Sequence, residues 1–282
     1  MRRLLALFSD THGGHKLSLM NPETWLLDAD MQPYQPQLSA MQRWLWANYQ
    51  DDLANVERLA NGDRIDVLHV GDMTWGAAHI EGVVSTRMAD QIIIGEANLE
   101  PWLALPNVAS MTLITGTDSH ELGESSTPIL AARDLQRVHL QASVTVTHHL
   151  LAEVDGYSID AAHHGPTKGK REWLDGNELR RYGQSMQREE VLAGNTPPNL
   201  VVRAHTHASW RETVRLQAGK RLHVTDLLIC PAYCGLTPYA RKVTQSLAVI
   251  GCGVWAVELV DGEPRRFTEL AHLQDLRERR RL

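Results

Sequence analysis

Apolar runs alternate with amphipathic stretches over the first half of the chain. Each apolar run ends in polar residues, as a buried strand does when it meets a turn. The predicted strands are 3–8, 66–70 and 109–115. Apolar positions at steps of three and four between them predict helices. The predicted helices are 37–60, 80–104 and 127–136, and the first ends at Asn61-Gly62-Asp63.

The second half of the chain is richer in strand signals. Its predicted strands are 138–146, 150–157, 158–162, 200–204, 210–216, 221–229, 245–251 and 253–260, with one polar helical stretch within 168–194. Alternating elements followed by many strands predict an α/β sandwich, with sheets in the middle and helices outside. No linker-like stretch divides the chain, so we expect a single domain over residues 1–282. Residues 15–60 and 168–198 are expected to be excursions that form the rim of a site and set its specificity.

The composition excludes several classes of protein. Hydrophobic residues make up 43% of the 282 residues and charged residues 22%, which argues against a disordered chain. No apolar stretch is long enough to span a membrane, and the first apolar run ends at Ser9-Asp10, too early for a signal peptide. The three cysteines, Cys230, Cys234 and Cys252, form no disulfide framework and are interpreted as buried thiols. We therefore expect a cytoplasmic protein that is not bound to a membrane.

Charge and histidine content narrow the function. The net charge of −6 does not suit broad, sequence-blind binding of nucleic acid, although a local basic patch would permit it. The chain has 14 histidines, and they cluster near aspartates with no cysteine pairs beside them. This combination is typical of a metal-dependent hydrolase.

Five predicted strands end in residues that can bind metal. These are Asp10 with His12, Asp72, Asp118 with His120, His163 with His164, and His205 with His207. Ligands of open α/β sheets gather outside the carboxyl ends of the strands, so residues distant in sequence can meet there. The donors are carboxylates and imidazoles, which suit Mn²⁺, Fe, Zn²⁺ or Mg²⁺.

The motifs Asp10-x-His12, Gly71-Asp72, Gly116-x-x-x-His120, His163-His164 and His205-x-His207 resemble, in order and spacing, those of the calcineurin-like metallophosphoesterases. The resemblance covers roughly residues 4–210. Asp-x-His-x-Gly followed by residues 17–23 is also similar to phage- and prophage-borne members of that superfamily.

The resemblance implies a four-layer α/β/β/α sandwich of two mixed sheets flanked by helices, with a metal site at the carboxyl ends of the strands. It implies two divalent ions, Mn²⁺ as the first expectation and Mg²⁺, Fe or Zn²⁺ as alternatives. Asp10, His12 and His207 would hold one ion, His163 and His205 the other, and Asp72 both. An activated water would then hydrolyse a phosphomonoester or phosphodiester.

The third motif departs from the family pattern, which is Gly-Asn-His with an asparagine ligand and a histidine general acid. The chain instead has Gly116-Thr117-Asp118-Ser119-His120. Either Asp118 replaces the asparagine oxygen or His120 itself becomes the ligand, which leaves the general acid open. Two smaller departures are Met73-Thr74-Trp75 after the second motif and Ala204 before the last one.

Several alternatives remain open at this point. His163 is favoured over His164 as the ligand, and His164 would then orient the ligand or the phosphate. Trp75 is interpreted as a packing residue rather than a base-stacking one. Lys168, Lys170 and Arg171 are interpreted as a solvated basic face. The rival functions are a nuclease acting on DNA or RNA and a metal-bound binding protein without turnover, and the oligomeric state is open.

Overall fold

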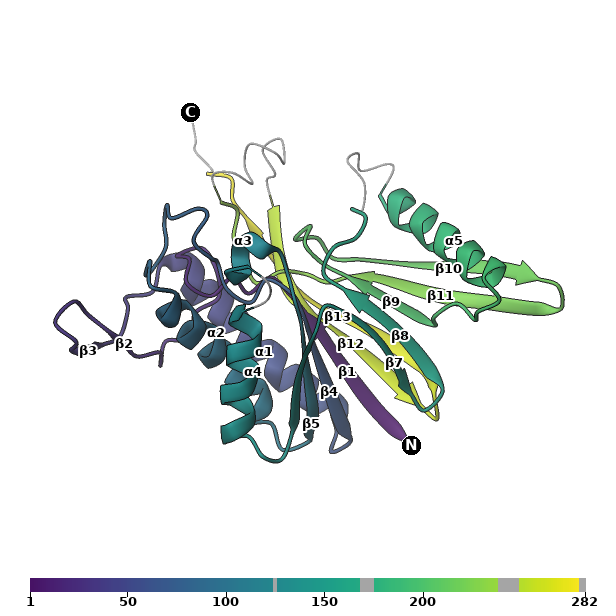
Figure 1. Cartoon of the computed structure of the whole chain (residues 1–282), viewed down its shortest axis with the longest axis horizontal. Helices are drawn as coiled ribbons and strands as arrows, with labels where there is room; N and C mark the ends of the chain where they lie inside the picture. Colours follow the sequence, from purple (N-terminus) through teal and green to yellow (C-terminus); the bar gives the residue numbers. More distant parts are fainter. Residues whose placement is uncertain (124–125, 168–174, 238–248, 279–282) are drawn as a thin grey trace.

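Two large β-sheets form the centre of the computed structural model (Figure 1), which describes residues 1–123, 126–167, 175–237 and 249–278. The first has six strands in the order β13-β12-β1-β4-β5-β6. These are β13 (Glu263–Asp275), β12 (Val249–Val260), β1 (Arg2–Phe8), β4 (Arg64–Val70), β5 (Val108–Ile114) and β6 (Ser143–Thr147). Strands β1, β4, β5 and β6 run parallel, whereas β12 and β13 are antiparallel to their neighbours. The carboxyl ends of four strands therefore share one edge.

The second sheet has five strands in the order β10-β11-β9-β8-β7. Their bounds are β10 (Trp210–Ala218), β11 (Arg221–Ile229), β9 (Leu200–Arg203), β8 (Tyr157–Ala162) and β7 (His149–Val154). Strands β8, β9 and β11 are parallel, and β7 and β10 pair antiparallel at the two sides. The carboxyl ends of β8, β9 and β11 therefore lie at one edge of the second sheet.

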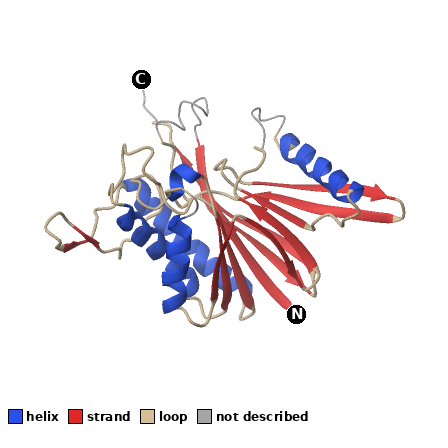
Figure 2. Ribbon diagram, in the orientation of Figure 1, coloured by secondary structure: helices blue, strands red, loops and turns tan. Residues whose placement is uncertain are grey.

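Helices cover the outer face of each sheet (Figure 2). Helices α1 (Ala40–Ala60), α2 (Met88–Leu103) and α4 (Ser126–Val138) pack on the six-stranded sheet, and α5 (Asn177–Leu192) packs on the five-stranded one. The remaining elements are α3 (Asp118–Glu121), β2 (Leu26–Leu27) and β3 (Pro33–Tyr34).

Strand β1 shows why its sequence is apolar throughout. Leu4, Ala6 and Phe8 lie in the core under the helices, whereas Leu5 and Leu7 lie in a second core with residues of the other sheet. Successive side chains of a strand point to opposite faces, so a strand buried on both faces needs a continuous apolar run. The chain is a mixed α/β protein with more strand than helix, which agrees with the predicted class at that level.

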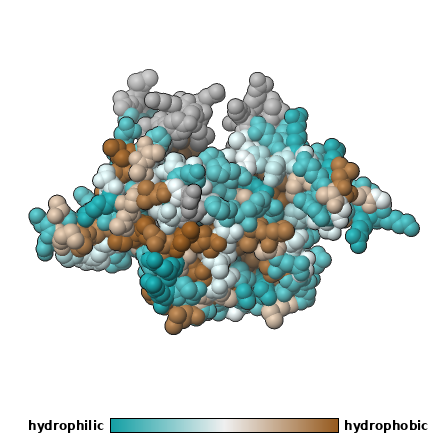
Figure 3. Space-filling view, viewed as in Figure 1, coloured by the Kyte–Doolittle hydropathy of each residue, from teal (hydrophilic) through white to brown (hydrophobic). Residues whose placement is uncertain are grey.

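The β2–β3 hairpin projects from the helix side of the molecule (Figure 1). Two exposed side chains belong to this region: Trp25 directly before β2 and Met31 in the turn between the strands. On the face that Figure 3 shows, hydrophobic residues are interspersed with hydrophilic ones. Among the described residues, no helix is both long enough and apolar enough to cross a membrane.

Helix α1 keeps close to its predicted bounds because both ends carry strong signals. Ser39 caps the first turn in a capping box with Gln42, and Asn61 adopts the left-handed conformation that ends a helix. The buried Leu45, Tyr49 and Val56 pack against the sheet. Within the predicted excursion 15–60, this helix is therefore part of the core, and the irregular part is 15–39.

Other predicted bounds were wrong. Helix α2 begins at Met88, not at residue 80. Residues 150–157 are not one strand, because β7 turns into β8 at Asp155-Gly156, both with positive φ. Strand β12 runs unbroken through Cys252, and β13 was not predicted. Asp261-Gly262 makes the same kind of turn before β13, and Asp-Gly between strands is a hairpin signal that the sequence offers directly.

Candidate metal centre

The carboxyl ends of strands from both sheets bring the predicted ligands together. Asp10 and His12 follow β1, Asp72 follows β4, and His163 and His205 follow β8 and β9. Backbone hydrogen bonds hold these segments side by side: Asp10 N–H donates to Gly71 O (3.0 Å) and His12 N–H to Asp72 O (3.0 Å). The parallel pairing thus fixes where each polar loop starts, and the loop bonds fix where its side chains lie.

The backbone at these residues is strained. Ten non-glycine residues of the described chain have a positive φ, and five of them are predicted ligands: Asp10 (51°), His12 (43°), Asp72 (55°), His205 (70°) and His207 (50°). Residues with side chains rarely adopt this region and incur a free-energy cost of order 1–3 kcal/mol there, so such strain clusters at functional sites. The remaining five lie at turns or helix ends. The concentration at one edge therefore indicates a site rather than chance.

Two of the motif glycines, Gly71 and Gly116, lie so close to predicted ligands that a side chain would collide with them. A Cβ added to Gly71 would lie 2.3 Å from His163 Nδ1, and one added to Gly116 would lie 2.1 Å from Asp72 Oδ1. No side chain fits at either position without moving a predicted ligand. Glycine at position 71 therefore leaves room for the ring of His163, and glycine at position 116 leaves room for Asp72.

One group of donors forms around Asp10. His207 Nε2 lies 3.2 Å from Asp10 Oδ1, and His12 Nε2 lies 3.6 Å from the same oxygen. The two imidazole nitrogens are 3.2 Å apart. Nitrogens and a carboxylate oxygen that converge in this way leave room for a cation between them.

A second group forms around Asp72. His163 Nε2 lies 3.1 Å from Asp72 Oδ2, and the Nε2 atoms of His12 and His120 each lie 3.9 Å from it. His163 Nδ1 is bonded to Val70 O at 2.7 Å, which orients the ring and turns Nε2 towards the site. The Thr117 N–H donates to Asp72 Oδ1 at 2.6 Å.

A third group adjoins the second. Ring nitrogens of His163, His164 and His205 lie within 4.8 Å of one another. His163 is buried, whereas His164 and His205 are exposed.

Buried atoms without hydrogen bonds test whether these residues suit a metal. Asp10 is 0% exposed, yet Asp10 Oδ1 and His163 Nε2 make no aligned hydrogen bond within the described chain, although His207 Nε2 lies 3.2 Å from the first and Asp72 Oδ2 3.1 Å from the second. A buried polar atom without a partner costs about 1–3 kcal/mol, so natural proteins seldom leave two of them together. A carboxylate oxygen and imidazole nitrogens are suitable donors for a divalent cation, and the residues therefore fit metal ions.

The carboxylates and imidazoles of the site shift one another's pKa values. Burial opposes ionisation of Asp10 and Asp72, but the surrounding histidines outweigh it and hold the pKa of each carboxyl below its usual value. Burial also opposes protonation of His163, but Asp72 and Asp10 outweigh it and raise the pKa of His163 to about 9. Burial lowers the pKa of His12 to about 3. The cluster thus combines two anionic oxygens with a neutral His12.

The structure brings every predicted ligand to this edge except Asp118. Asp118 is exposed at the first position of α3 and belongs to none of the donor groups within the described chain. His120, two residues later, turns its ring towards Asp72, with Nδ1 bonded to Trp75 O at 2.6 Å. Thr117 stands closest to Asp72, and its hydroxyl lies 3.4 Å from His164 and 3.5 Å from His205.

Sequence reasoning missed three residues of the site. Thr117 is the first. Glu121 is buried, accepts a hydrogen bond from the Gly116 N–H (2.6 Å), and burial raises its pKa to about 7. Cys234 places its sulfur within 4.8 Å of nitrogens of His12 and His207. The position of Thr117 directly after Gly116 could have revealed it, whereas nothing local marks Glu121 or Cys234.

The surroundings of the ligands are packed. Trp75 is buried and stacks on His15 with ring centroids 4.2 Å apart. It contacts His12 edge-on and His120 at a tilt. This agrees with the prediction that Trp75 is a packing residue. Lys168, Lys170 and Arg171 lie outside the described residues.

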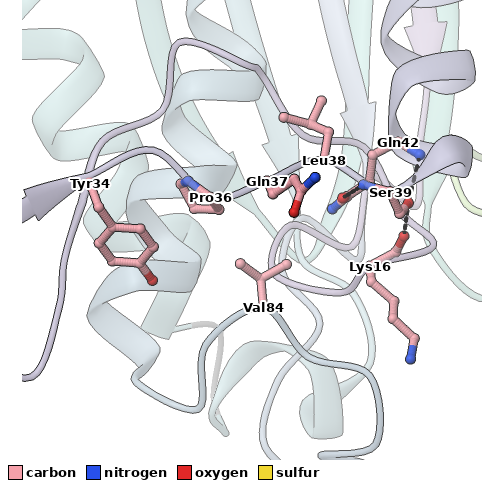
Figure 4. Close-up of a pocket in the computed structure, with 8 residues that line it drawn as sticks. All are labelled: Lys16, Tyr34, Pro36, Gln37, Leu38, Ser39, Gln42 and Val84. Carbon is pink, nitrogen blue, oxygen red and sulfur yellow. Dashed lines mark hydrogen bonds between the residues drawn. The ribbon is translucent and has the colours of Figure 1, made fainter.

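A surface pocket of about 460 Å³ lies next to this region, beyond His15. Figure 4 shows Tyr34 at one end and Lys16 at the other, with Val84 between them. Gln42, which also lines it, donates to His15 O at 3.2 Å. No predicted ligand lines the pocket, so it borders the candidate metal centre without being part of it.

The comparisons with known proteins leave the function open. Neither a known protein family nor a curated protein matches the sequence. A solved structure from Aquifex aeolicus, a protein of unknown function called AQ665, is 17% identical over 73% of this chain and 80% of its own, with a TM-score of 0.32. That likeness is too low to carry an argument about this chain.

Proposed function

We propose that this protein is a metal-dependent phosphoesterase of the calcineurin-like kind, which hydrolyses a phosphomonoester or a phosphodiester. The observation that carries the proposal is the position of Asp72. Its carboxylate belongs to two donor groups, one with Asp10 and His163 and one with His12 and His120. A carboxylate with donors on both sides suits a pair of ions about 3.5–4 Å apart.

We further propose that the fold is the four-layer α/β/β/α sandwich of that superfamily. An apolar core joins the two sheets, and separate cores join each sheet to the helices on its outer face. These three cores support the order helix, sheet, sheet, helix.

The residues would divide between two ions. Asp10, His12 and His207 would hold one, His163 and His205 the other, and Asp72 would contact both. Divalent ions held there would supply positive charge for the phosphoryl oxygens and would lower the pKa of an attacking water. The buried Asp10 Oδ1 and His163 Nε2, which make no aligned hydrogen bond within the described chain, support this division.

The protein's own residues position these groups. The Val70 carbonyl orients His163, and the Thr117 N–H fixes the Asp72 carboxylate. The Trp75 carbonyl orients His120 through Nδ1 and leaves Nε2 towards Asp72. With a proton on Nε2, His120 can protonate the leaving oxygen; without it, Nε2 is a further donor for an ion.

The test is turnover of bis-p-nitrophenyl phosphate and p-nitrophenyl phosphate by the Mn²⁺-loaded protein, with metal content measured in parallel. We expect about two ions per chain and hydrolysis that Asp72→Asn lowers by more than the roughly 10–100-fold that loss of an outer partner of a ligand causes. Asp52→Asn, a buried aspartate outside the site, is the control and should keep activity.

Three outcomes would contradict the proposal. Turnover that persists in Asp72→Asn would place the reaction elsewhere. Stoichiometric metal with no turnover of either ester would favour the binding protein. Cleavage of single-stranded DNA or RNA much faster than the chromogenic esters would favour the nuclease.

A further inference from the structure

The segment after β11 reaches the candidate metal centre by the same geometry as the predicted ligands. Strand β11 pairs parallel with β9, so its carboxyl end lies at the ligand edge of the sheet. Leu19 N–H then donates to Tyr233 O (3.0 Å), and Gly235 N–H donates to Leu17 O (2.6 Å). These bonds hold Cys234 beside the loop that carries His12.

The sulfur of Cys234 faces two of the predicted ligands. Its Sγ atom and nitrogens of His12 and His207 all lie within 4.8 Å of one another. The side chain is 4% exposed, and its thiol donates to the carbonyl of Gly235 (3.4 Å). The thiol is therefore buried at a set of imidazoles rather than in an apolar core.

A second observation points to a ligand at the same place. Asp10 Oδ1 is buried and makes no aligned hydrogen bond within the described chain, although His207 Nε2 lies 3.2 Å and His12 Nε2 3.6 Å from it. The other two cysteines differ from Cys234, because Cys230 and Cys252 pack in the apolar cores and belong to none of the donor groups of the described residues.

We propose that Cys234 is a thiolate donor to the ion that Asp10, His12 and His207 hold, and that this site consequently selects a thiophilic ion such as Zn²⁺, Cd²⁺ or Co²⁺ over Mg²⁺ or Mn²⁺. The inference rests on the proposed metal centre and changes the expected ion for one of its two positions. On binding, the sulfur–hydrogen bond breaks, the sulfur electron pair binds the cation, and the proton passes to solvent. A soft sulfur donor shifts preference towards softer ions.

The first experiment uses Co²⁺ as a spectroscopic probe of the metal-free full-length protein. Binding through Cys234 should produce a thiolate-to-cobalt charge-transfer absorption in the near ultraviolet, besides the weaker visible bands of a nitrogen and oxygen site. Cys234→Ser should lose the charge-transfer absorption and keep the visible bands. The double variant Cys230→Ser with Cys252→Ser retains Cys234 as its single cysteine and should keep both.

The second experiment compares affinities for Cd²⁺ and Mn²⁺ by calorimetry. Loss of an outer partner already lowers metal affinity about 10–100-fold, so loss of a direct donor should lower Cd²⁺ affinity at least about tenfold. Mn²⁺ affinity should change by less, because Mn²⁺ gains little from sulfur. Melting of each variant with EDTA present verifies that it folds, and if Cys234→Ser does not fold, the single-cysteine variant still decides the matter.

The outcomes separate this inference from the proposed function. Visible bands with no charge-transfer absorption in the wild type would overturn the role of Cys234 and leave the metal centre standing. No bound Co²⁺ by elemental analysis would overturn both. An equal loss of Cd²⁺ and Mn²⁺ affinity in Cys234→Ser would show a structural role and also overturn the inference.

Discussion

Two buried clusters of aspartate and histidine in this protein differ in how their polar atoms are satisfied. In the Asp52 cluster (Asp52, Tyr233 and His272), one carboxylate oxygen accepts from the Tyr233 hydroxyl at 2.6 Å and the other pairs with His272 Nε2 at 2.7 Å. In the candidate metal centre, Asp10 is equally buried, but its Oδ1 makes no aligned hydrogen bond with any described residue.

A structural polar cluster and a ligand site of similar composition therefore differ in two properties, the hydrogen bonding of their buried atoms and the backbone conformation of their residues. Asp52 lies within α1, whereas Asp10 and Asp72 have a strained, positive φ. Satisfied polar atoms on a relaxed backbone stabilise the fold. Buried polar atoms without hydrogen bonds, on a strained backbone, lower the stability of the fold. Such a cluster persists where function requires it.

Removal of Asp52 should destabilise the protein most. Asp52→Ala leaves the buried Tyr233 hydroxyl without its acceptor and opens a cavity, which should lower the free energy of unfolding by about 2–4 kcal/mol. Urea unfolding with EDTA present measures the change. Asp51→Ala, the exposed neighbour on the same helix, is the control and should change it by less than about 0.5 kcal/mol. A small effect of Asp52→Ala would remove the basis of the comparison.

Metal should stabilise through one cluster and not through the other. With Mn²⁺ at about 100 times its dissociation constant, the free energy of unfolding should rise by about 2.7 kcal/mol for one site. Asp72→Asn should abolish most of this rise, whereas Asp52→Asn should keep it. Unfolding curves with and without Mn²⁺ check both variants, and equal stabilisation of the two would refute the assignment of the ligand site.

The Asp52 cluster should also make stability depend on pH. Burial is the largest influence on Asp52 and raises its pKa to about 6, although hydrogen bonds with Tyr233 and His272 act the other way. The folded protein then holds this proton more tightly than the unfolded chain, whose aspartate pKa is 3.8. Between the two values the folded state binds more protons, so the contribution of Asp52 to stability falls as the pH rises.

The pH effect is measured as a difference between two proteins. From about pH 4.5 to pH 7, the free energy of unfolding of the wild type should fall relative to that of Asp52→Asn by about 2 kcal/mol. Asparagine keeps an acceptor for Tyr233 and does not titrate, and both proteins share the histidines of the metal centre. With EDTA present, a constant difference across this range would show that the pKa of Asp52 is not raised.

The smallest effect should come from Asp118. Asp118→Ala removes an exposed side chain outside the donor groups, so metal content should stay the same and turnover should change by no more than about twofold. His120→Ala removes a ring that faces Asp72 and should lower turnover, with a loss of metal if His120 is a ligand. Elemental analysis and ester hydrolysis distinguish these results, and a loss of metal in Asp118→Ala alone would restore the alternative that Asp118 replaces the family's asparagine.

The predicted site residues depend on a rule that operates at long range. Asp10, Asp72, His163 and His205 each follow an apolar strand, and the parallel pairing of those strands brings them to one edge. Local patterns indicated those strands, so the meeting of the residues could be predicted. Asp118 differs because the chain coils into α3 directly after Gly116-Thr117, and a one-turn helix has too few residues for a periodic signal.

The failures in the fold have comparable causes. Strand β13 alternates exposed and half-buried residues and carries several charges, so no apolar run marked it. The start of α2 was placed too early because Ile80, Val83 and Val84 follow three- and four-residue steps, although these residues lie in turns and an isolated bridge. Both elements are defined by pairing and packing with distant parts of the chain.

Three features could be predicted from the sequence alone: the order of strands and helices in the first half, the strand ends that carry aspartate and histidine, and the glycines beside them. These follow from local periodicity and from steric limits on single residues. Three further features depend on the tertiary structure. Thr117 rather than Asp118 contacts Asp72, and Cys234 lies beside His12 and His207. Both carboxylate oxygens of Asp52 have hydrogen-bond partners, whereas Asp10 Oδ1 has none among the described residues. The physical reason is that hydrogen-bond satisfaction and metal-donor geometry are properties of atoms brought together from distant segments, and residue spacing carries no information on them.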